Sequence, residues 1–504
     1  MRKHIPLFFS LFVAFILRIA WKLYTHYTYE DAFITFRFAR NLSNGLGFVY
    51  NPNEHVYGTT TPLFAIILGM WIKIFPNLIV FGASMFGLLS GLASIVLVWK
   101  LLNEFHISKT QSILAIGVLV LSDKFWAHDM GGMETALVIC AMMASYFMLV
   151  RNRSTWAGLF AGTLLWIRID GVFWFCILVL VTWVITRQFP RNFIVIATLV
   201  YLPWLVFATL YFGSPIPYTI SAKWVAYHTI GLQPVLIRIQ TLLNWLTPLS
   251  LPTLSTNLIS WIAAITILFS FIGTMAYRRQ KWLMVLPVFC LEEIVRLVVM
   301  GETFEPRYFM PLFWALMILF GLGVRTVWGY LSGRFKLKPI LGFSTIAVYI
   351  CISLWFSLQK AQLGKDTQYF VYDSSLKQLG IWLEKNTPTS STVFLEPLGY
   401  IGFYANRHML DEVGLVSPQV VALKNEGYST FALITSLDPD YAILHCDDAL
   451  RASNAFLARY SKVIDFNPMG FDPYTPMNHD PNLSELVRQN ISRQRTACYQ
   501  VWKK

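Results

Sequence analysis

The stretch YEDAFITFRFARNLSNGLGFVYNPNEHVYGTTTP, residues 29–62, follows the first long apolar segment of the chain. It contains two adjacent acids, Glu30 and Asp31, two arginines, Arg37 and Arg40, and a dense set of glycine and aromatic residues. The apolar segments on either side of this stretch determine on which side of a membrane it lies.

The chain has 504 residues, of which 56% are hydrophobic and only 13% are charged. Soluble domains carry about 25% charged residues. Runs of about 20 apolar residues, the length that crosses a bilayer, recur as far as about residue 358. The first run, residues 6–24, resembles a signal peptide, but no small-residue cleavage site follows it, so we expect a retained span. The sequence predicts a polytopic helical membrane protein.

Basic residues near span ends mark the cytoplasmic side of a membrane protein. Six clusters supply them: Arg2/Lys3, Lys100/Lys109, Arg151/Arg153, Arg187/Arg191, Arg278/Arg279/Lys281 and Arg325/Arg334/Lys336/Lys338. Placing all six inside predicts about eleven spans, near 6–24, 78–100, 110–124, 134–150, 154–169, 171–187, 193–212, 255–276, 281–300, 308–330 and 338–358. The N-terminus then lies inside and the tail outside. The net charge of +13 follows this topology, and we expect no nucleic-acid partner.

This topology requires that LFAIILGMWIKIF, residues 63–75, does not cross, and we expect a helix lying in the outer interface. If it crosses, every later loop changes sides. With the expected topology, all polar motifs fall on the outer face: YEDAFITFRFARN (29–41), DKFWAHDMGGMETAL (123–137), RIDG (168–171), YFGSPIPYTISAKW (211–224) and GETFEPRYFMP (301–311). A transporter would instead keep polar groups near the bilayer midplane.

Residues 359–504 form a tail long enough for a small domain. Helical patterns alternate there with the short apolar runs STVFLEP, DYAILH, SKVIDF and ACYQVW, whereas PLGYIGFYANRHMLDEVGLVSP is rich in loop signals. We therefore predict an all-α membrane domain over 1–358, with residues 25–77 as a first outer loop carrying interfacial helices, and an extracytoplasmic α/β domain over 359–504. Cys446 and Cys498 could form a disulfide there, which the sequence alone leaves open.

The acids of the first loop are the leading catalytic candidates. Asp31, with Glu30 beside it, can act as a general base, because an adjacent acid or partial burial raises the pKa of a carboxyl group. The alternative is a pair of acids at a helix start, near the positive end of the helix dipole. Arg37 and Arg40 lie three residues apart on one helix face and could clamp a phosphate, or could simply contact lipid headgroups.

Further outer-face residues are candidates for substrate binding. Glu134 opens a span and could bind sugar hydroxyls or share a divalent cation, or could be an ordinary helix-start acid. Arg168 and Asp170 could bind substrate or form a local salt bridge, and Lys223 and Arg307 could contact a phosphate. Within one span lie Glu292, Glu293 and Arg296; charges there are functional candidates, although Glu292 and Arg296 could pair at i, i+4. No nucleotide-binding, zinc or nucleophile-elbow motif occurs.

Taken in series, these motifs resemble the GT-C superfamily of integral membrane glycosyltransferases. EDAFITFRFARNLSNGLGFVYNPNEHVYGTTTPL is similar to the first-loop signature of bacterial arabinofuranosyltransferase-like members, with Glu30 where that group usually has Asp. GGMETAL, RIDG, FGSPIPYTISAK, RYFMP and GYIGFY…DEVGL look like its later motifs, in the same order. The resemblance implies a polyprenyl-phosphate sugar donor, an inverting transfer to an acceptor hydroxyl, and Asp31 as the catalytic base.

The resulting hypothesis is a glycosyltransferase of the inner membrane that acts on a cell-envelope glycan or lipid acceptor at the extracytoplasmic face. Arginines and Lys223 would hold the donor phosphate, and the tail would help to bind the acceptor. No cofactor is expected with certainty, and a divalent cation is an option. The alternatives are a membrane transporter, for which charges such as Glu292 would be essential, and a scaffold of envelope polysaccharide assembly, which would tolerate loss of the first-loop acids.

Overall fold

The computed structural model describes residues 5–227, 232–251, 254, 256–299, 305–336, 338–470 and 495–504. The chain divides into two compact units, which are described separately. The helical unit comprises Met1–Tyr24, Ala83–Trp204 and Thr229–Gln362, and the mixed unit comprises Thr25–Gly82, Leu205–His228 and Leu363–Lys504. In this division residues 25–82 belong to the same unit as the tail from Leu363 onward, and not to the unit of the long apolar helices.

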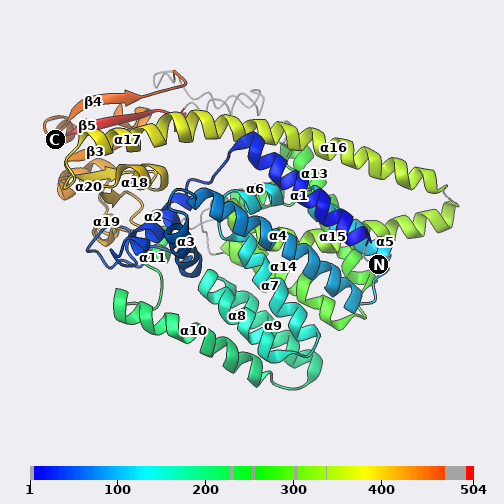
Figure 1. Ribbon diagram of the computed structural model, residues 1–504. Helices are drawn as coiled ribbons and strands as arrows, with labels where there is room; N and C mark the ends of the chain where they lie inside the picture. The colour runs from blue at the N-terminus through cyan, green and yellow to red at the C-terminus, as the bar shows by residue number, and fades with distance from the viewer. Residues whose placement is uncertain are drawn as a thin grey trace. The chain divides into compact units, whose positions relative to one another are not determined.

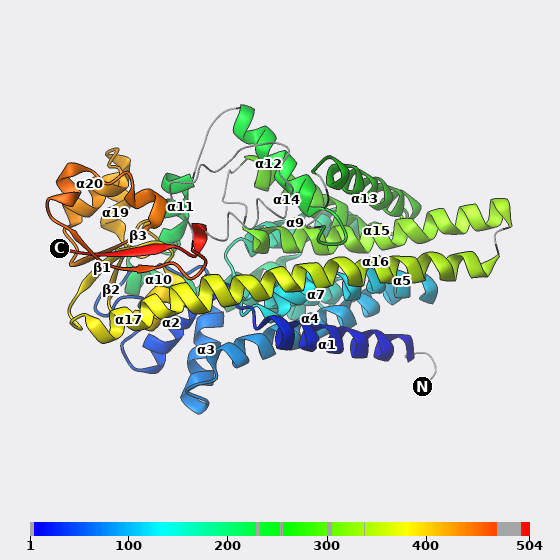
Figure 2. The ribbon, with the colours of Figure 1, turned by 90° about the horizontal axis from the view of Figure 1, so that it is seen from above.

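The helical unit follows the expected series of apolar segments. Its helices are α1 (Ile5–Thr25), α4 (Ile79–Glu104), α5 (Lys109–Leu121), α6 (Asp123–Met130), α7 (Thr135–Val150), α8 (Ser154–Ile167), α9 (Gly171–Thr186), α10 (Arg191–Phe212), α12 (Leu232–Trp245), α13 (Thr256–Ala276), α14 (Val285–Val299), α15 (Pro306–Phe335) and α16 (Pro339–Asp366). A 3-10 turn, η1 (Lys281–Met284), precedes α14. Most of these helices are labelled in Figure 1, and Figure 2 shows that the axes of the long helices α1, α15 and α16 lie roughly parallel, with α15 and α16 opposite in chain direction.

Among the described residues, six helices are long and apolar enough to cross a membrane, and the chain is a multi-pass membrane protein. They are Ile5–Thr25, Ile79–Glu104, Arg191–Phe212, Asn257–Ala276, Arg307–Phe335 and Ile340–Asn386. The pair α6 and α7, bent by 106°, makes a seventh if it counts as one broken span. Although a helix occupies each of the eleven expected places, α5, α8 and α9 are shorter than about 20 residues. Eleven crossings therefore stay a prediction.

Small residues determine how closely the central helix α15 packs. A side chain at Gly273 of α13 would meet the backbone oxygen of Leu319, and one at Gly323 of α15 would meet that of Phe269. Gly321 faces Ala115 of α5 in the same way. Apolar side chains gain little from contact with each other in lipid, so close backbone approach through small residues is a main source of helix association.

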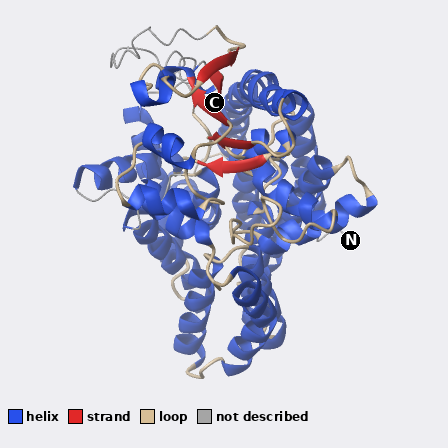
Figure 3. Ribbon diagram, turned by 90° about the vertical axis from the view of Figure 1, so that its left-hand side faces the viewer, coloured by secondary structure: helices blue, strands red, loops and turns tan. Residues whose placement is uncertain are grey.

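The mixed unit is built on a five-stranded sheet, drawn in red in Figure 3. Its strands are β1 (Thr392–Leu395), β2 (His408–Asp411), β3 (Tyr441–His445), β4 (Ser461–Phe466) and β5 (Tyr499–Lys503), in the order β2-β1-β3-β5-β4. Strand β1 is parallel to both of its neighbours, β2 and β3, and β5 is antiparallel to both β3 and β4. The four apolar runs of the tail thus form strands. The stretch interpreted as loop-rich contains β2, a strand of only four residues at the edge of the sheet.

Helices cover both faces of this sheet. Around it lie α17 (Lys377–Asn386), α18 (Gly399–Ala405), α19 (Pro418–Asn425), α20 (Thr430–Leu437), α21 (Cys446–Ala449) and α22 (Asn454–Leu457), preceded by the π-helix η2 (Thr367–Leu376). Phe394, Ala442 and Leu444 point to one face, where they pack with Leu433 and Ile434 of α20. Figure 2 shows α19 and α20 on that side of the strands and α17 on the other.

The first-loop segments complete the mixed unit. They form α2 (Ala32–Ser43) and α3 (Pro62–Ile74), and residues after α10 form α11 (Tyr218–Tyr227). The expected helix at 63–75 is α3; it packs on α2, where Gly69 lies so close to the backbone oxygen of Ala39 that an added Cβ would stand 3.1 Å from it. Cys446 and Cys498 form a disulfide that joins the end of β3 to the start of β5.

Candidate functional site

The two acids of the first loop lie at the junction between α1 and α2. Asp31 is the N-cap residue of α2 and is partly exposed, so it lies at the positive end of the helix dipole. Glu30 turns toward α18, where its Oε1 accepts a hydrogen bond of 3.0 Å from the backbone N–H of Tyr400 and another from Gly399. The helix-start alternative thus describes the local geometry of Asp31, and Glu30 is part of a tertiary contact.

Glu30 is in an environment that disfavours its charged form. Burial raises its pKa well above the ordinary value, and the charge of neighbouring Asp31 raises it further, against the lowering effect of the Tyr400 N–H. Glu30 interacts electrostatically with Tyr499, Tyr372 and Tyr50, which are neutral side chains and do not balance a carboxylate charge. A neutral Glu30 can both accept a hydrogen bond and donate one.

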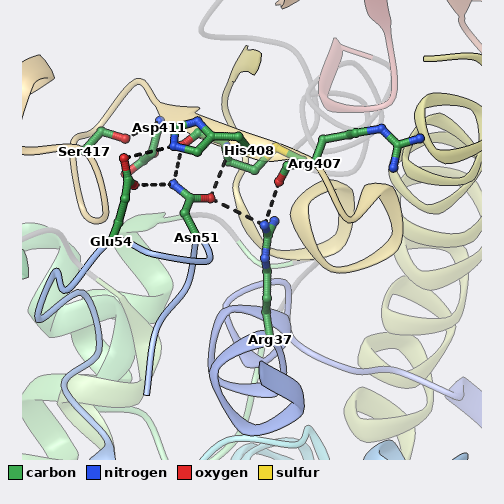
Figure 4. A network of polar contacts seen from close by, with 8 residues as sticks. Arg37, Asn51, Glu54, Arg407, His408, Asp411 and Ser417 are labelled. Atoms are coloured by element: carbon green, nitrogen blue, oxygen red, sulfur yellow. Dashed lines mark hydrogen bonds and ion pairs between the residues drawn. The ribbon is translucent and has the colours of Figure 1, made fainter. Parts of the chain in front are cut away.

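Arg37 was expected to contact a phosphate, but its guanidinium is occupied by the protein itself. Its Nε donates to the Tyr50 oxygen at 2.9 Å, Nη1 to Gly402 at 2.7 Å and Nη2 to Arg407 at 2.6 Å. Nη2 also lies 3.4 Å from Asn51 Oδ1, and the residue is 1% exposed (Figure 4). These contacts favour a structural role for Arg37 over phosphate binding.

Arg40 differs from Arg37, although both lie on α2. Its Nη1 donates to the Phe403 oxygen at 2.8 Å, its guanidinium carbon lies 4.4 Å from the centre of the Phe403 ring, and the residue remains partly exposed. Burial and the neighbouring Arg37 charge lower its pKa to about 10, so it stays cationic at neutral pH. Arg40 is therefore the member of the pair that retains a free surface toward an anion.

The second half of the first loop completes the edge of the sheet. Asn51 Nδ2 donates to the Met409 oxygen at 2.9 Å, and Asn51 Oδ1 accepts from the Met409 N–H at 3.0 Å (Figure 4). Glu54 pairs with His408 at 2.9 Å. Since β2 is an edge strand, Asn51 satisfies backbone groups that a further strand would otherwise bind.

In the helical unit, four of the predicted residues gather around Tyr308. Arg168 Nε donates to Asp170 Oδ1 at 2.8 Å, and Arg168 Nη1 lies 3.7 Å from Glu134 Oε1. The guanidinium carbons of Arg168 and Arg307 lie 5.0 and 5.2 Å from the centre of the Tyr308 ring. The local salt bridge expected for RIDG therefore exists, but it belongs to a larger cluster.

This cluster has unused hydrogen-bonding capacity. Glu134 and Arg168 are 1% and 2% exposed, and Glu134 Oε2 and Arg168 Nη1 have no hydrogen-bond partner within the described part of the chain. A buried acceptor beside a buried donor matches what a hydroxyl group can satisfy. In the described ranges, no group of three or more His, Cys, Asp or Glu side chains is arranged to hold a metal ion.

The remaining predicted residues belong to other helices. Lys223 belongs to α11 of the mixed unit and is partly buried. In the helical unit, Arg296 forms an ion pair of 2.6 Å with Glu293, its i, i+3 neighbour on the same helix. Residues 301–304 of the motif GETFEPRYFMP lie outside the described residues, as do Arg2 and Lys3.

Sequence reasoning missed two buried charges of the helical unit. Arg18, within α1, pairs with Asp129 at 2.6 Å. Lys124 donates to the backbone oxygens of Trp245 at 2.6 Å and Thr247 at 2.8 Å. A charge inside an apolar segment, as at Arg18, is the signal that could have revealed the first pair.

Comparison with known proteins identifies the class of fold. Residues 361–496 match a family described as a domain of unknown function, DUF8728, and no curated protein matches the chain. Among solved structures, the Archaeoglobus fulgidus oligosaccharyltransferase superposes with a TM-score of 0.58 at 14% identity, covering 92% of this chain and 73% of its own. The likeness is one of fold, and it agrees with the GT-C fold that the motifs predicted.

A second similar protein is ArnT from Cupriavidus metallidurans. Its structure bound to undecaprenyl phosphate has a TM-score of 0.58 at 14% identity and covers 90% of this chain and 95% of its own. The apo structure of the same protein superposes with a TM-score of 0.54 at 13% identity, and the match covers 86% of this chain and 93% of ArnT. The present chain thus matches nearly the full length of ArnT in fold.

Proposed function

We propose that this protein is an integral membrane glycosyltransferase that moves a sugar from a polyprenyl-phosphate donor to a cell-envelope glycan or lipid acceptor. The observation that carries the proposal is the likeness in fold to ArnT, whose structure holds undecaprenyl phosphate, over 90% of this chain. The polar residues predicted from the outer loops, with Asp31 at the start of α2, supply the groups that such a reaction needs.

The proposed reaction is a direct displacement with inversion. Asp31 accepts the proton of the acceptor hydroxyl while that oxygen attacks the anomeric carbon. The bond from this carbon to the phosphate oxygen breaks on the opposite face, and the polyprenyl phosphate leaves with the electron pair. Phosphate is a good leaving group, so one carboxylate suffices, in contrast to the two carboxylates of glycoside hydrolysis.

The cations and the acid Glu134 have separate parts in this proposal. Arg307, Arg40 and Lys223 are the candidates for stabilising the charge that grows on the leaving phosphate. Arg37 is left out of this set, because its guanidinium is occupied by backbone oxygens. Glu134, with Arg168 and Asp170 beside it, binds hydroxyl groups of the sugar or the acceptor.

The reaction is proposed for the extracytoplasmic face of the inner membrane. The disulfide between Cys446 and Cys498 supports this location for the tail, because structural disulfides form in oxidising compartments. Polyprenyl-phosphate sugars are also donors that can be used where no nucleotide sugar is available.

The test is a transfer assay on purified protein in detergent, with a panel of polyprenyl-phosphate sugars and envelope glycan acceptors. Asp31→Asn should lower kcat by about 10² to 10⁴, the usual contribution of a general base. Asp465→Asn, at an exposed acid of β4, is the matched control and should keep parental activity. Full activity in a folded Asp31→Asn variant would contradict the assignment, and a parent that consumes no donor would favour transport or scaffolding.

A further inference from the structure

Helix α18 of the tail lies unusually close to the first loop. A Cβ at Gly399 would overlap the backbone oxygen of Glu30, and one at Gly402 would overlap the Tyr50 hydroxyl and stand 3.2 Å from Arg37 Nη1. The two glycines lie three residues apart, on one face of the helix. Only a helix without side chains on this face can approach the loop so closely.

We propose that α18 holds the first loop in place and that Glu30 is a positioning residue, which orients the carboxylate of Asp31 without taking part in the chemistry. This assignment deepens the proposed function and rests on it. It also gives the tail a role in the transfer reaction beyond binding the acceptor.

The carboxyl group of Glu30 bridges the helix and the neighbouring acid. Its Oε1 accepts from the N–H groups of Tyr400, at 3.0 Å, and Gly399, and a further hydrogen bond joins its side chain to Asp31. One of the two carboxyl groups must carry the proton of that last bond. Burial raises the pKa of Glu30, which supports Glu30 as the donor and Asp31 as the charged acceptor.

The contact does not depend on Glu30 alone. The Phe33 ring lies 3.9 Å from that of Tyr400 and 5.3 Å from that of Phe403, centre to centre. Arg37 and Arg40 donate to the backbone oxygens of Gly402 and Phe403. The residues on either side of Asp31 are thus tied to one short helix, and Asp31 has little freedom to move relative to it.

This arrangement distinguishes Glu30 from Asp31 in a way that substitutions can test. Glutamine at position 30 keeps an oxygen to accept from Tyr400 and Gly399 and an N–H to donate to Asp31. Alanine keeps neither. Asparagine at position 31 removes the group that accepts the proton.

The experiment compares Glu30→Gln, Glu30→Ala and Asp31→Asn in the full-length protein in detergent, with kcat and KM for one polyprenyl-phosphate sugar. We expect Glu30→Gln to stay within about threefold of the parental kcat. Glu30→Ala should lose about 10- to 100-fold in kcat with little change in KM, the cost of a misplaced catalytic group. Asp31→Asn should lose 10² or more.

The second readout is hydrogen exchange of residues 29–41, which does not depend on activity. Exchange should be faster in Glu30→Ala and parental in Glu30→Gln, since only alanine removes the hydrogen bonds from the N–H groups of Tyr400 and Gly399 to residue 30. Gly399→Ala, which changes no acid, should have the same effect as Glu30→Ala on both readouts.

The results separate the inference from the function on which it rests. If the parent is active and Glu30→Gln is as inactive as Asp31→Asn, Glu30 takes part in the chemistry and the inference is overturned while the function stands. Parental kcat in Glu30→Ala would also overturn it. If the parent consumes no donor, the proposed function fails, and unchanged exchange in Glu30→Ala would then refute the hold of α18 on the loop.

Discussion

Arg37 and Arg40 show how much the surroundings decide about a single side chain. In the sequence they are equivalent, three positions apart on one helix face. In the structure Arg37 donates to oxygens of residues 402 and 407 and is 1% exposed, whereas Arg40 keeps part of its surface free. No local pattern could have separated them, because two of the three backbone oxygens that Arg37 contacts, those of Gly402 and Arg407, lie more than 360 residues further along the chain.

The buried guanidinium leads to a prediction about stability. A lysine at position 37 cannot reach the oxygens of Tyr50, Gly402 and Arg407 together, because an ammonium lacks the planar fork of arginine. Arg37→Lys should therefore lower the free energy of unfolding by about 3 kcal/mol or more. Arg40→Lys is the matched control, with an expected loss below about 1 kcal/mol. Denaturant unfolding in detergent measures both, and equal losses would contradict the difference between the two sites.

Asp411, at the end of β2, leads to a prediction about pH. Burial raises its pKa from the ordinary 3.8 to about 6, with a further rise from Glu412 and opposition from the N–H groups of Leu415 and Val413. Between these two values the unfolded chain has lost the proton and the folded chain has kept it. The folded state is thus favoured below about pH 4 and loses this advantage as the pH rises to about 6.

The expected size of this loss is on the order of 3 kcal/mol, from two pKa units at about 1.4 kcal/mol each. The measurement is the unfolding free energy of the parent and of Asp411→Asn between pH 4 and pH 7. The unfolding free energy of Asp411→Asn should rise relative to that of the parent from pH 4 to about pH 6, and the difference between the two should stay constant above that pH. A difference independent of pH would show that Asp411 titrates normally in the folded protein.

Among the helices and strands, the short elements of the tail were the hardest to anticipate. The runs of β1, β3, β4 and β5 are apolar and were expected, but β2 consists of only four residues, His408–Asp411, in a stretch rich in loop signals. It is stabilised by parallel pairing with β1 and by Asn51 of the first loop, neither of which is local in sequence.

The disulfide leads to a prediction about the sheet. It joins the end of β3 to the start of β5 across 52 residues, and a crosslink over such a loop stabilises the folded state by about 4 kcal/mol in the chain-entropy model. The double variant Cys446→Ser/Cys498→Ser should lose about 2 to 4 kcal/mol, and dithiothreitol should destabilise the parent but not this variant. Cys351→Ser, at an exposed free cysteine, is the control. A parent indifferent to reductant would contradict the prediction.

For the chain as a whole, the orientation in the membrane is the main prediction still open. Within the part of the chain that the structure describes, six helices are long and apolar enough to span a membrane, and the basic clusters predict eleven crossings with the tail outside. Single cysteines introduced at Lys462 in the tail and Arg153 between α7 and α8 should react oppositely with a membrane-impermeant thiol reagent applied to intact cells. Lys462→Cys should be labelled and Arg153→Cys should not. Labelling of both or of neither would overturn the odd number of crossings, seven, that is predicted between these two sites.

The class of fold was accessible from the order of the motifs and the apolar runs, because hydropathy and charge act locally and leave their period in the sequence. The candidate acids Asp31, Glu30 and Glu134 could be chosen for the same reason, since a carboxylate beside an apolar segment is conspicuous. Residues 25–82, however, join the tail in one compact unit, and that grouping depends on packing between distant segments.

The roles of individual residues required the tertiary structure. Glu30 accepts hydrogen bonds from the N–H groups of Gly399 and Tyr400. Arg37 donates to backbone oxygens of the tail, and Arg168 forms ion pairs with Asp170 and Glu134. A hydrogen bond depends on distance and direction in space, and a backbone group offers the same donor or acceptor at almost every position of the chain. Sequence can therefore indicate which side chains carry charge, but only the folded chain decides which partner each charge meets.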